Sequence, residues 1–374
     1  MTDTMWQPWA PDILGPDYES ATLRLGPDPD GEGEAVATLV RRTPVTDGPA
    51  VLWIHGMTDY FFQDHLAAHL AEAGYAFYAL DLRKCGRSHR HGQRWHYTSD
   101  LRHYHPELTA ALDHVAARHP SVVPMAHSTG GLIAVLWFDW LRRARPELAR
   151  RVAGMVLDSP WLALQYGARN PLIAGAAHVL GRLRPGMALP GGDLNAYGES
   201  IAADWDFDER YKPVAGTPKY AGWLLAVVRG MEQLRGGLDL HLPVLTLTSD
   251  RSWLGQPYSA ASDTADTVLE VEAIRPVAES LGAAAEVVPV PGARHDVYLS
   301  LPLALEQALT ETTGFLDRVT GGDGADPADP GSADDAAHLN RPQWWGGHGR
   351  PRGPAEERGA DEDLRPDHRR HRFG

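Results

Sequence analysis

Apolar and polar residues follow two different periods along the chain. Short continuous apolar runs, which are typical of parallel strands buried on both faces, cover residues 49–56, 75–80, 122–127, 152–157, 243–249 and 286–290. Between several of these runs apolar positions recur at helical spacing, as over 59–73, which Gly74 ends, and over 101–118. Two earlier runs, 21–25 and 34–42, flank a turn rich in Gly, Pro and Asp and predict an opening hairpin. This order of elements predicts an α/β fold with a mostly parallel central sheet and helices on both faces.

The third long apolar run ends abruptly at Ser128 and passes straight into a helical pattern. A sharp strand-to-helix turn brings the residues two before and two after its centre together, so both must be small. Here they are Ala126 and Gly130, one methyl group away from the usual pattern with two glycines. Such a turn exposes a serine hydroxyl for use as a nucleophile. The pattern favours a nucleophile elbow over a serine that merely caps the next helix.

His295 is the candidate base for this serine. It lies in the loop 292–296, just after the apolar run 286–290, so the loop can deliver the imidazole to the carboxyl edge of the sheet. It also follows the serine in the chain order serine, acid, histidine. The alternative is an ordinary histidine in a surface loop.

Three segments, in their order and spacing, resemble the motifs of the α/β-hydrolase superfamily. They are His55-Gly56-Met57, the segment from Leu80 to Ser88, and the segment from Ala126 to Gly131. Within this superfamily the chain resembles the serine aminopeptidase S33 group, which includes lysophospholipases and monoacylglycerol lipases. The resemblance covers about residues 20 to 318. It implies that the backbone N–H groups of Met57 and Thr129 form the oxyanion hole.

The resemblance also implies an acid that is followed by one helix and one strand before the histidine. The interval from Asp266 to His295 accommodates this unit, with a helix expected to start at Asp266. Asp250 lies directly at the end of a strand, but its interval to the histidine requires a long insertion. We therefore predict Asp266 as the acid and keep Asp250 as the alternative, with Asp263 and Asp158 as weaker candidates. Asp266 could also serve only as the cap of its own helix.

Residues 159–239 interrupt the alternation of strands and helices and are rich in aromatic residues, Pro and Gly. The resemblance implies that this insertion is a helical cap over the active site. We expect the core to comprise 21–158 and 240–320, preceded by an N-terminal extension over 1–20. Residues 321–374 contain few large aliphatic side chains, which predicts a disordered tail.

Composition excludes several classes of protein. Cys85 is the only cysteine, so the chain can form neither an intrachain disulfide nor a thiolate metal cluster. A net charge of −14 disfavours nucleic acid and anionic membranes as partners. No apolar run reaches the roughly 20 residues of a membrane span, and the N-terminus lacks a signal-peptide pattern. We therefore expect a cytoplasmic protein.

Several histidines cluster in one region of the sequence: His89, His91, His96, His103 and His105. Their spacing matches no known metal-ligand pattern, so a solvated loop explains them better than a metal site. The sequence also contains no flavin or nicotinamide signature, and we expect neither a metal nor another cofactor.

Together these features predict a serine hydrolase that cleaves a carboxylic ester through an acyl-enzyme on Ser128. His295 transfers the proton and Asp266 orients the imidazole. The resemblance implies a small-molecule or lipid-like ester, such as a monoacylglycerol or lysophospholipid; the oligomeric state stays open. One alternative is an S33-type aminopeptidase, whose amine site could use the acidic residues Glu199, Asp204, Asp206, Asp208 and Glu209. The other is a non-catalytic binding protein on the same fold.

Overall fold

The structure, a computed structural model, describes residues 6–190 and 194–321. Within these residues nine strands form one sheet in the order β1-β2-β3-β5-β4-β6-β7-β8-β9. The strands are β1 (Ala10–Asp12), β2 (Gly15–Pro27), β3 (Glu34–Arg42), β4 (Ala50–Ile54), β5 (Ala76–Asp81), β6 (Val122–His127), β7 (Met155–Asp158), β8 (Val244–Ser249) and β9 (Ala285–Val290). The first three are antiparallel, and β4 to β9 run parallel.

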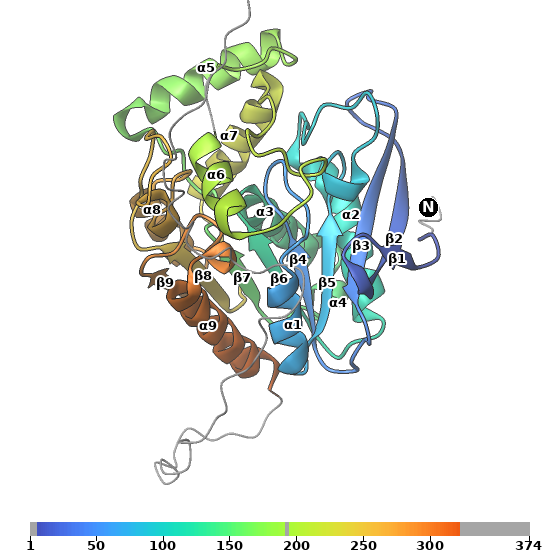
Figure 1. The fold of residues 1–374 in the computed structure, drawn as a ribbon. Helices are drawn as coiled ribbons and strands as arrows, with labels where there is room; N and C mark the ends of the chain where they lie inside the picture. Colours follow the sequence, from blue (N-terminus) through green and yellow to red (C-terminus); the bar gives the residue numbers. More distant parts are fainter. Residues whose placement is uncertain (1–5, 191–193, 322–374) are drawn as a thin grey trace, which may run out of the picture.

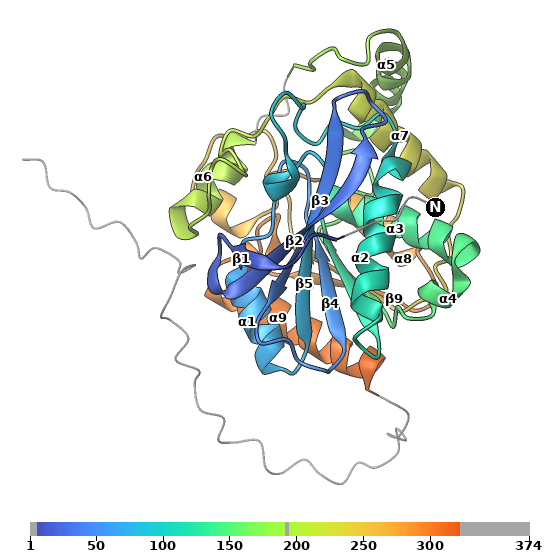
Figure 2. The same cartoon turned by 90° about the vertical axis from the view of Figure 1, so that its right-hand side faces the viewer.

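Helices cover both faces of this sheet (Figures 1 and 2). The α-helices are α1 (Asp64–Glu72), α2 (His105–Ala116), α3 (Thr129–Ala144), α4 (Pro146–Ala149), α5 (Asn170–Leu183), α6 (Asn195–Asp204), α7 (Ala221–Arg235), α8 (Val271–Glu279) and α9 (Pro302–Thr320). Alternate residues of each central strand enter opposite cores. In β4, Leu52 and Ile54 join the core under α2 and α3, whereas Val51 and Trp53 join the core under α1 and α9. This burial on both faces explains the continuous apolar runs. No helix of the described residues is long and apolar enough to cross a membrane.

Two elements begin at other positions than the sequence pattern predicts. The sheet starts at Ala10, inside the segment 1–20 where we expected an extension, because β1 pairs antiparallel with β2, whose Tyr18 and Ala21 are buried. Helix α1 starts at Asp64 instead of residue 59, and the residues before it form a buried loop. The expected disordered tail lies outside the described residues from 322 onward.

The segment between β7 and β8 contains α5, α6 and α7. Helix α7 packs against both α3 and α5 (Figure 1), and its Trp223, Val227 and Met231 belong to the main hydrophobic core. Helix α7 therefore serves as the crossover helix between the two parallel strands. The division of the chain into a core and a cap over 159–239 stays a prediction, with α5, α6 and the loop 205–220 as the parts beyond this crossover helix.

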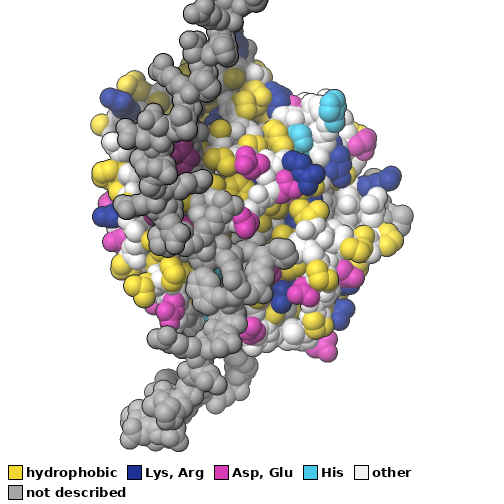
Figure 3. Space-filling model, viewed as in Figure 1, with side chains coloured by type: hydrophobic (Ala, Val, Ile, Leu, Met, Phe, Trp, Pro, Cys, Tyr) yellow, Lys and Arg dark blue, Asp and Glu magenta, His cyan; other side chains and the backbone are white. Residues whose placement is uncertain are grey.

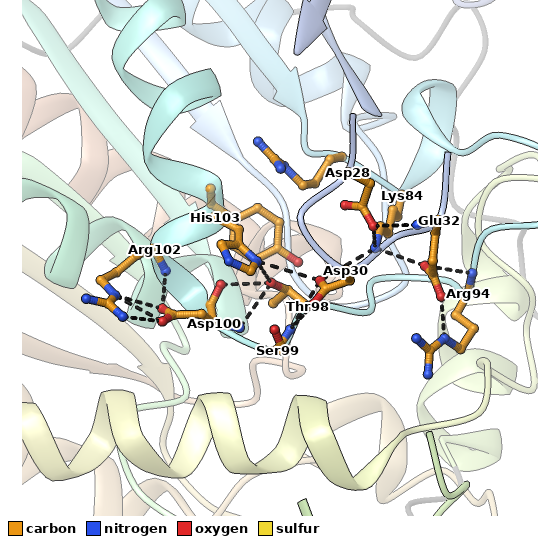
Figure 4. Close-up of polar contacts among 12 residues, drawn as sticks. Asp28, Asp30, Glu32, Lys84, Arg94, Thr98, Ser99, Asp100, Arg102 and His103 are labelled. Atoms are coloured by element: carbon orange, nitrogen blue, oxygen red, sulfur yellow. Dashed lines mark hydrogen bonds and ion pairs between the residues drawn. The ribbon is translucent and has the colours of Figure 1, made fainter. Parts of the chain in front are cut away.

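The histidine-rich loop after β5 is held by ion pairs to the turn between β2 and β3 (Figure 4). The ammonium group of Lys84 is buried and lies 2.6 Å from Asp28 Oδ2 and 2.9 Å from Glu32 Oε2. The loop's histidines have separate partners: His103 lies 3.6 Å from Asp30 Oδ2, and His89 stacks on Trp95. Among the described residues, the one group of side chains close enough to share a metal ion includes none of the five clustered histidines.

Candidate active site

Ser128 lies at the turn from β6 into α3 with a backbone φ of 53°, a value that non-glycine residues rarely adopt. A Cβ atom on Gly130 would lie 2.4 Å from the carbonyl oxygen of His55, and one on Gly131 would lie 2.6 Å from Pro160 Cβ. Glycine is therefore required where the new helix passes over the sheet. The Ser128 N–H donates to the carbonyl of Asp158, which fixes the turn to β7.

His295 joins Ser128 to Asp266. Its Nε2 lies 2.9 Å from Ser128 Oγ, and its Nδ1 lies 2.9 Å from Asp266 Oδ2. All three side chains are buried, and Ser128 is 8% exposed. An Nδ1–H that donates to the carboxylate leaves the Nε2 lone pair free to accept the serine proton, which is the arrangement of a serine–histidine–aspartate triad.

Backbone groups stabilise the charge of Asp266. Its Oδ1 accepts hydrogen bonds from the N–H groups of Val268 and Leu269, both at 2.8 Å, while Oδ2 faces His295. The residue does not start a helix as we expected, because its side chain closes a turn and α8 begins at Val271. These two N–H groups and His295 Nδ1 together fix the orientation of the buried carboxylate toward the imidazole.

The other three candidate acids have different partners. Asp250 is exposed and accepts a hydrogen bond from the Gly292 N–H at 3.1 Å. Asp263 forms an ion pair with Arg294 at 3.2 Å, and Asp158 lies against His127. Of the four candidate aspartates, only Asp266 forms a hydrogen bond with His295.

Met57 and Thr129 lie on either side of the nucleophile. A Cβ atom on Gly56 would be 3.0 Å from Ser128 Cβ, so the loop after β4 passes directly beside the serine. Met57 lines the same pocket as Ser128 and His295. Thr129 is the first residue of α3, so its N–H has no partner within the helix and points out of the positive end of the helix dipole. This placement suits both residues to the oxyanion role that the sequence predicts.

Residues between β7 and β8 close the pocket over the serine. Leu194, Tyr197 of α6 and Lys212 line it, and the Tyr197 ring packs edge-on against the His295 ring at 5.3 Å. An adjoining pocket is mainly apolar; among its lining residues are Phe207, Pro213 and Val214. Neither Tyr197 nor Lys212 was predicted from the sequence as a residue of the site. The rarity of lysine offered a signal, since Lys212 is one of three in the chain.

A buried polar group lies beneath the nucleophile. His127 Nδ1 is 3.0 Å from Asp158 Oδ2, and ligand atoms of His127, Asp158 and Asp296 lie within 4.8 Å of one another. The pKa of both carboxyls is raised to about 7, chiefly by burial and in addition by the charge of neighbouring carboxylates. Asp158 Oδ1 accepts a hydrogen bond from the Val297 N–H, and Asp296 Oδ2 accepts one from the Gln63 amide, whereas Asp158 Oδ2 and His127 Nδ1 have no hydrogen-bond partner among the described residues.

Comparison with known proteins identifies the family. The model of the family "Serine aminopeptidase, S33" matches residues 48–299. A monoacylglycerol lipase of Mycolicibacterium smegmatis is 32% identical over 220 residues, which are 57% of this chain and 73% of that protein.

Two solved structures show the shared fold. The monoacylglycerol lipase of Paleococcus ferrophilus superposes with a TM-score of 0.54 at 22% identity, covering 71% of this chain and 93% of that chain. A soluble variant of the monoglyceride lipase of Saccharomyces cerevisiae, in complex with a substrate analog, superposes with a TM-score of 0.58 at 17% identity, covering 85% and 96%. These findings confirm the predicted α/β-hydrolase fold, and the family match extends over more than half of the chain. The chain belongs to the serine aminopeptidase S33 family of the α/β-hydrolase superfamily.

Proposed function

We propose that the protein is a serine hydrolase that cleaves a carboxylic ester through an acyl-enzyme on Ser128. The observation that carries the proposal is the continuous hydrogen-bond chain from Ser128 Oγ through His295 to Asp266, with 2.9 Å at both steps. A serine hydroxyl becomes an effective nucleophile when a neighbouring base can take its proton. The family match and the related monoacylglycerol lipases support the same class of enzyme.

The geometry supports the following sequence of steps. Ser128 Oγ attacks the carbonyl carbon of the ester while its proton passes to His295 Nε2. The N–H groups of Met57 and Thr129 hold the negative charge that develops on the carbonyl oxygen. The tetrahedral intermediate then collapses as His295 returns the proton to the leaving alcohol, which leaves the acyl group on the serine. A water molecule, deprotonated by His295, attacks this acyl-enzyme and releases the acid.

The residues around the serine agree with a substrate that carries an apolar acyl chain. The pocket beside the catalytic one is lined by Leu194, Phe207 and Val214, which offer apolar surface continuous with the site of the nucleophile. An acyl chain is the ester component that gains most free energy from such a surface. We infer a lipid-like ester of the monoacylglycerol type as the substrate class, in agreement with the names of the relatives.

The aminopeptidase alternative requires an acidic side chain that is free to bind a substrate amine. Of the acids that the sequence suggested, Asp204 pairs with Arg294, Asp208 pairs with Arg210, and Glu199 is exposed. The acid that lines the pocket is Asp59, and the ammonium group of Lys212 lies 2.8 Å from it. A substrate amine would meet this cation first, so the pocket favours an ester.

A fluorophosphonate probe with peptide mass mapping tests the proposal, together with turnover of p-nitrophenyl esters from acetate to octanoate. We expect a single adduct on Ser128, and Ser128→Ala should lose both the adduct and the turnover while keeping its circular dichroism spectrum. A folded wild-type protein that neither reacts with the probe nor turns over any ester would overturn the proposal in favour of a non-catalytic binding protein.

A further inference from the structure

A buried arginine lies directly beside the catalytic base. The side chain of Arg294, the residue before His295, is only 1% exposed. Figure 3 shows Lys and Arg side chains next to Asp and Glu side chains at several places on the surface, where such pairs contribute little to stability. A guanidinium withdrawn from water is costly unless its N–H groups find partners within the protein. The contacts of Arg294 therefore show which parts of the chain it holds together.

Two partners of Arg294 belong to helix α6. Its Nε donates to Ser200 Oγ at 2.8 Å, and its Nη2 forms an ion pair with Asp204, the last residue of the helix. Tyr197 precedes these two residues by three and seven positions, so all three lie on one face of α6. The Tyr197 ring packs edge-on against the His295 ring. The arginine thus fixes α6 at the position from which Tyr197 covers the catalytic base.

A third partner belongs to the segment that carries the catalytic acid. Nη2 of Arg294 also lies 3.2 Å from Asp263 Oδ1, and the Ser200 hydroxyl donates to the same oxygen at 2.6 Å. Asp263 lies in the short helical turn Ser262–Thr264, three residues before Asp266. Its carboxylate therefore joins the segment of the acid to both the arginine and α6.

The remaining contacts close the loop of the base itself. Arg294 Nη1 donates to the carbonyl oxygen of Leu299 at 2.6 Å, and the Arg294 backbone N–H donates to Ser300 Oγ at 2.9 Å. Trp205, the residue after α6, donates from Nε1 to the same Leu299 carbonyl at 2.7 Å. These bonds tie the chain before His295 to the chain after it. The position of the imidazole depends on the guanidinium for this reason.

We propose that Arg294 is a positioning residue that aligns the base and the acid of the triad and holds α6 over them. The proposal rests on the proposed function, because the alignment matters only if Ser128, His295 and Asp266 perform the hydrolysis. A planar guanidinium has its donors in a rigid fork and can hold three segments at fixed angles, whereas an ammonium group is a single point of charge.

Steady-state kinetics on p-nitrophenyl acetate and octanoate test the proposal. In R294M we expect kcat to fall by about 10²-fold for both esters, since a misplaced imidazole slows the attack whatever the acyl chain. R294K should recover part of this loss, because lysine can pair with one of the two carboxylates. The matched control is R83K. Arg83 is also buried, in an ion pair with Glu107 that lies outside the catalytic segments, so R83K should keep a kcat near that of wild type.

D204N separates the contact with α6 from the other contacts. It keeps the arginine and removes only the ion pair to the helix, whose Tyr197 and Gly198 line the adjoining apolar pocket. We expect a higher KM for the octanoate ester and a smaller loss of kcat than in R294M. This variant also decides the question if R294M does not fold, because wild-type kinetics in D204N would then overturn the proposal.

Hydrogen exchange of the native proteins adds a readout that does not require turnover. Exchange in R294M should be faster in residues 195–204, 262–266 and 292–300 together, and R83K should leave these segments unchanged. Wild-type kcat in R294M, an equal loss of kcat in R83K, or unchanged exchange in the three segments would each overturn the role of Arg294. A wild type that reacts with neither the fluorophosphonate probe nor any ester would overturn the proposed function as well.

Discussion

Lys212 and Asp59 form a buried ion pair across the active-site pocket, with 2.8 Å between Nζ and Oδ1. Lys212 belongs to the loop before α7, and Asp59 belongs to the loop after β4 that also contains Met57. A second link joins the same two loops. Thr58, the residue before Asp59, lies with its Oγ1 2.7 Å from Oγ1 of Thr217, five residues after Lys212. The proposed oxyanion loop is thus held on its outer side by the segment that covers the pocket.

Replacing Lys212 by Met should therefore destabilise the protein. The side chains of Lys212 and Asp59 are 9% and 2% exposed, so the variant leaves a carboxylate buried without its partner. Removing one member of a buried pair costs about 3–5 kcal/mol. Urea unfolding measures the loss, and the double variant D59N/K212M should regain part of it.

The nearby pair of Arg210 and Asp208 supplies the control. The Arg210 side chain is exposed, so Arg210→Gln should leave the unfolding midpoint almost unchanged. If K212M lowered the unfolding midpoint as little as Arg210→Gln does, the buried pair would not hold the loop.

Asp266→Asn should reduce kcat by about 10³–10⁴. The Asn carbonyl oxygen can still accept from the Val268 and Leu269 N–H groups, which turns its NH₂ toward His295 Nδ1. His295 must then carry its proton on Nε2, where it cannot accept one from the serine. Steady-state turnover of a p-nitrophenyl ester measures the effect.

Asp250→Asn is the matched variant, because it changes the alternative acid, which the structure places away from His295. Its turnover should remain near that of wild type. The opposite result, with Asp250→Asn inactive and Asp266→Asn active, would transfer the role of acid to Asp250.

Local sequence patterns were sufficient for the fold and for the sharp turn at Ser128. The apolar runs of the central strands and the small residues around Ser128 are constraints within a few neighbouring positions, so one sequence reveals them. The predicted start of α1 was wrong because Phe62 continues the helical spacing of Leu66 and Leu70 but lies in a buried loop before the helix. The residues of this loop pack instead against aromatic residues that are far away in the sequence, as Phe62 does against Phe207.

The rest of the site depends on contacts between segments far apart in the chain. Nothing next to Lys212 or Asp59 in the sequence marks an ion pair between them, and Tyr197 lies in an ordinary helix that happens to reach His295. The helix predicted from Asp266 starts later for a related reason. The backbone of Asp266 forms hydrogen bonds with the backbone of Arg251 and Trp253, and no local sequence pattern predicts these contacts.

Gly130→Ala should disrupt the turn at the nucleophile. The added methyl group would meet the carbonyl oxygen of His55 at 2.4 Å, and this backbone directly follows the central strand β4 and is not free to move away. Overpacking of this kind costs about 1–3 kcal/mol, and the displaced serine should lose most of its turnover. Thermal unfolding and ester hydrolysis measure the two effects.

Gly175→Ala is the control within the same chain, because open space surrounds that position on α5. Alanine in a helix interior is favoured over glycine, so this variant should gain up to about 1 kcal/mol and keep its turnover. Equal behaviour of the two variants would show that the space around Gly130 does not constrain the turn.

The carboxyls beneath the nucleophile should make stability fall with rising pH between about 4 and 7. In the folded state the pKa of Asp158 and of Asp296 is about 7, above the ordinary value of 3.8, because burial disfavours the charged form. In this window the folded protein binds more protons than the unfolded chain, so the free energy of unfolding falls as the pH rises. Asp158→Asn cannot ionise, and its amide can donate to His127 Nδ1. Urea unfolding of both proteins at several pH values should show a flatter dependence for Asp158→Asn, with the difference confined to this window. Parallel curves would mean that these carboxyls do not hold extra protons in the folded state.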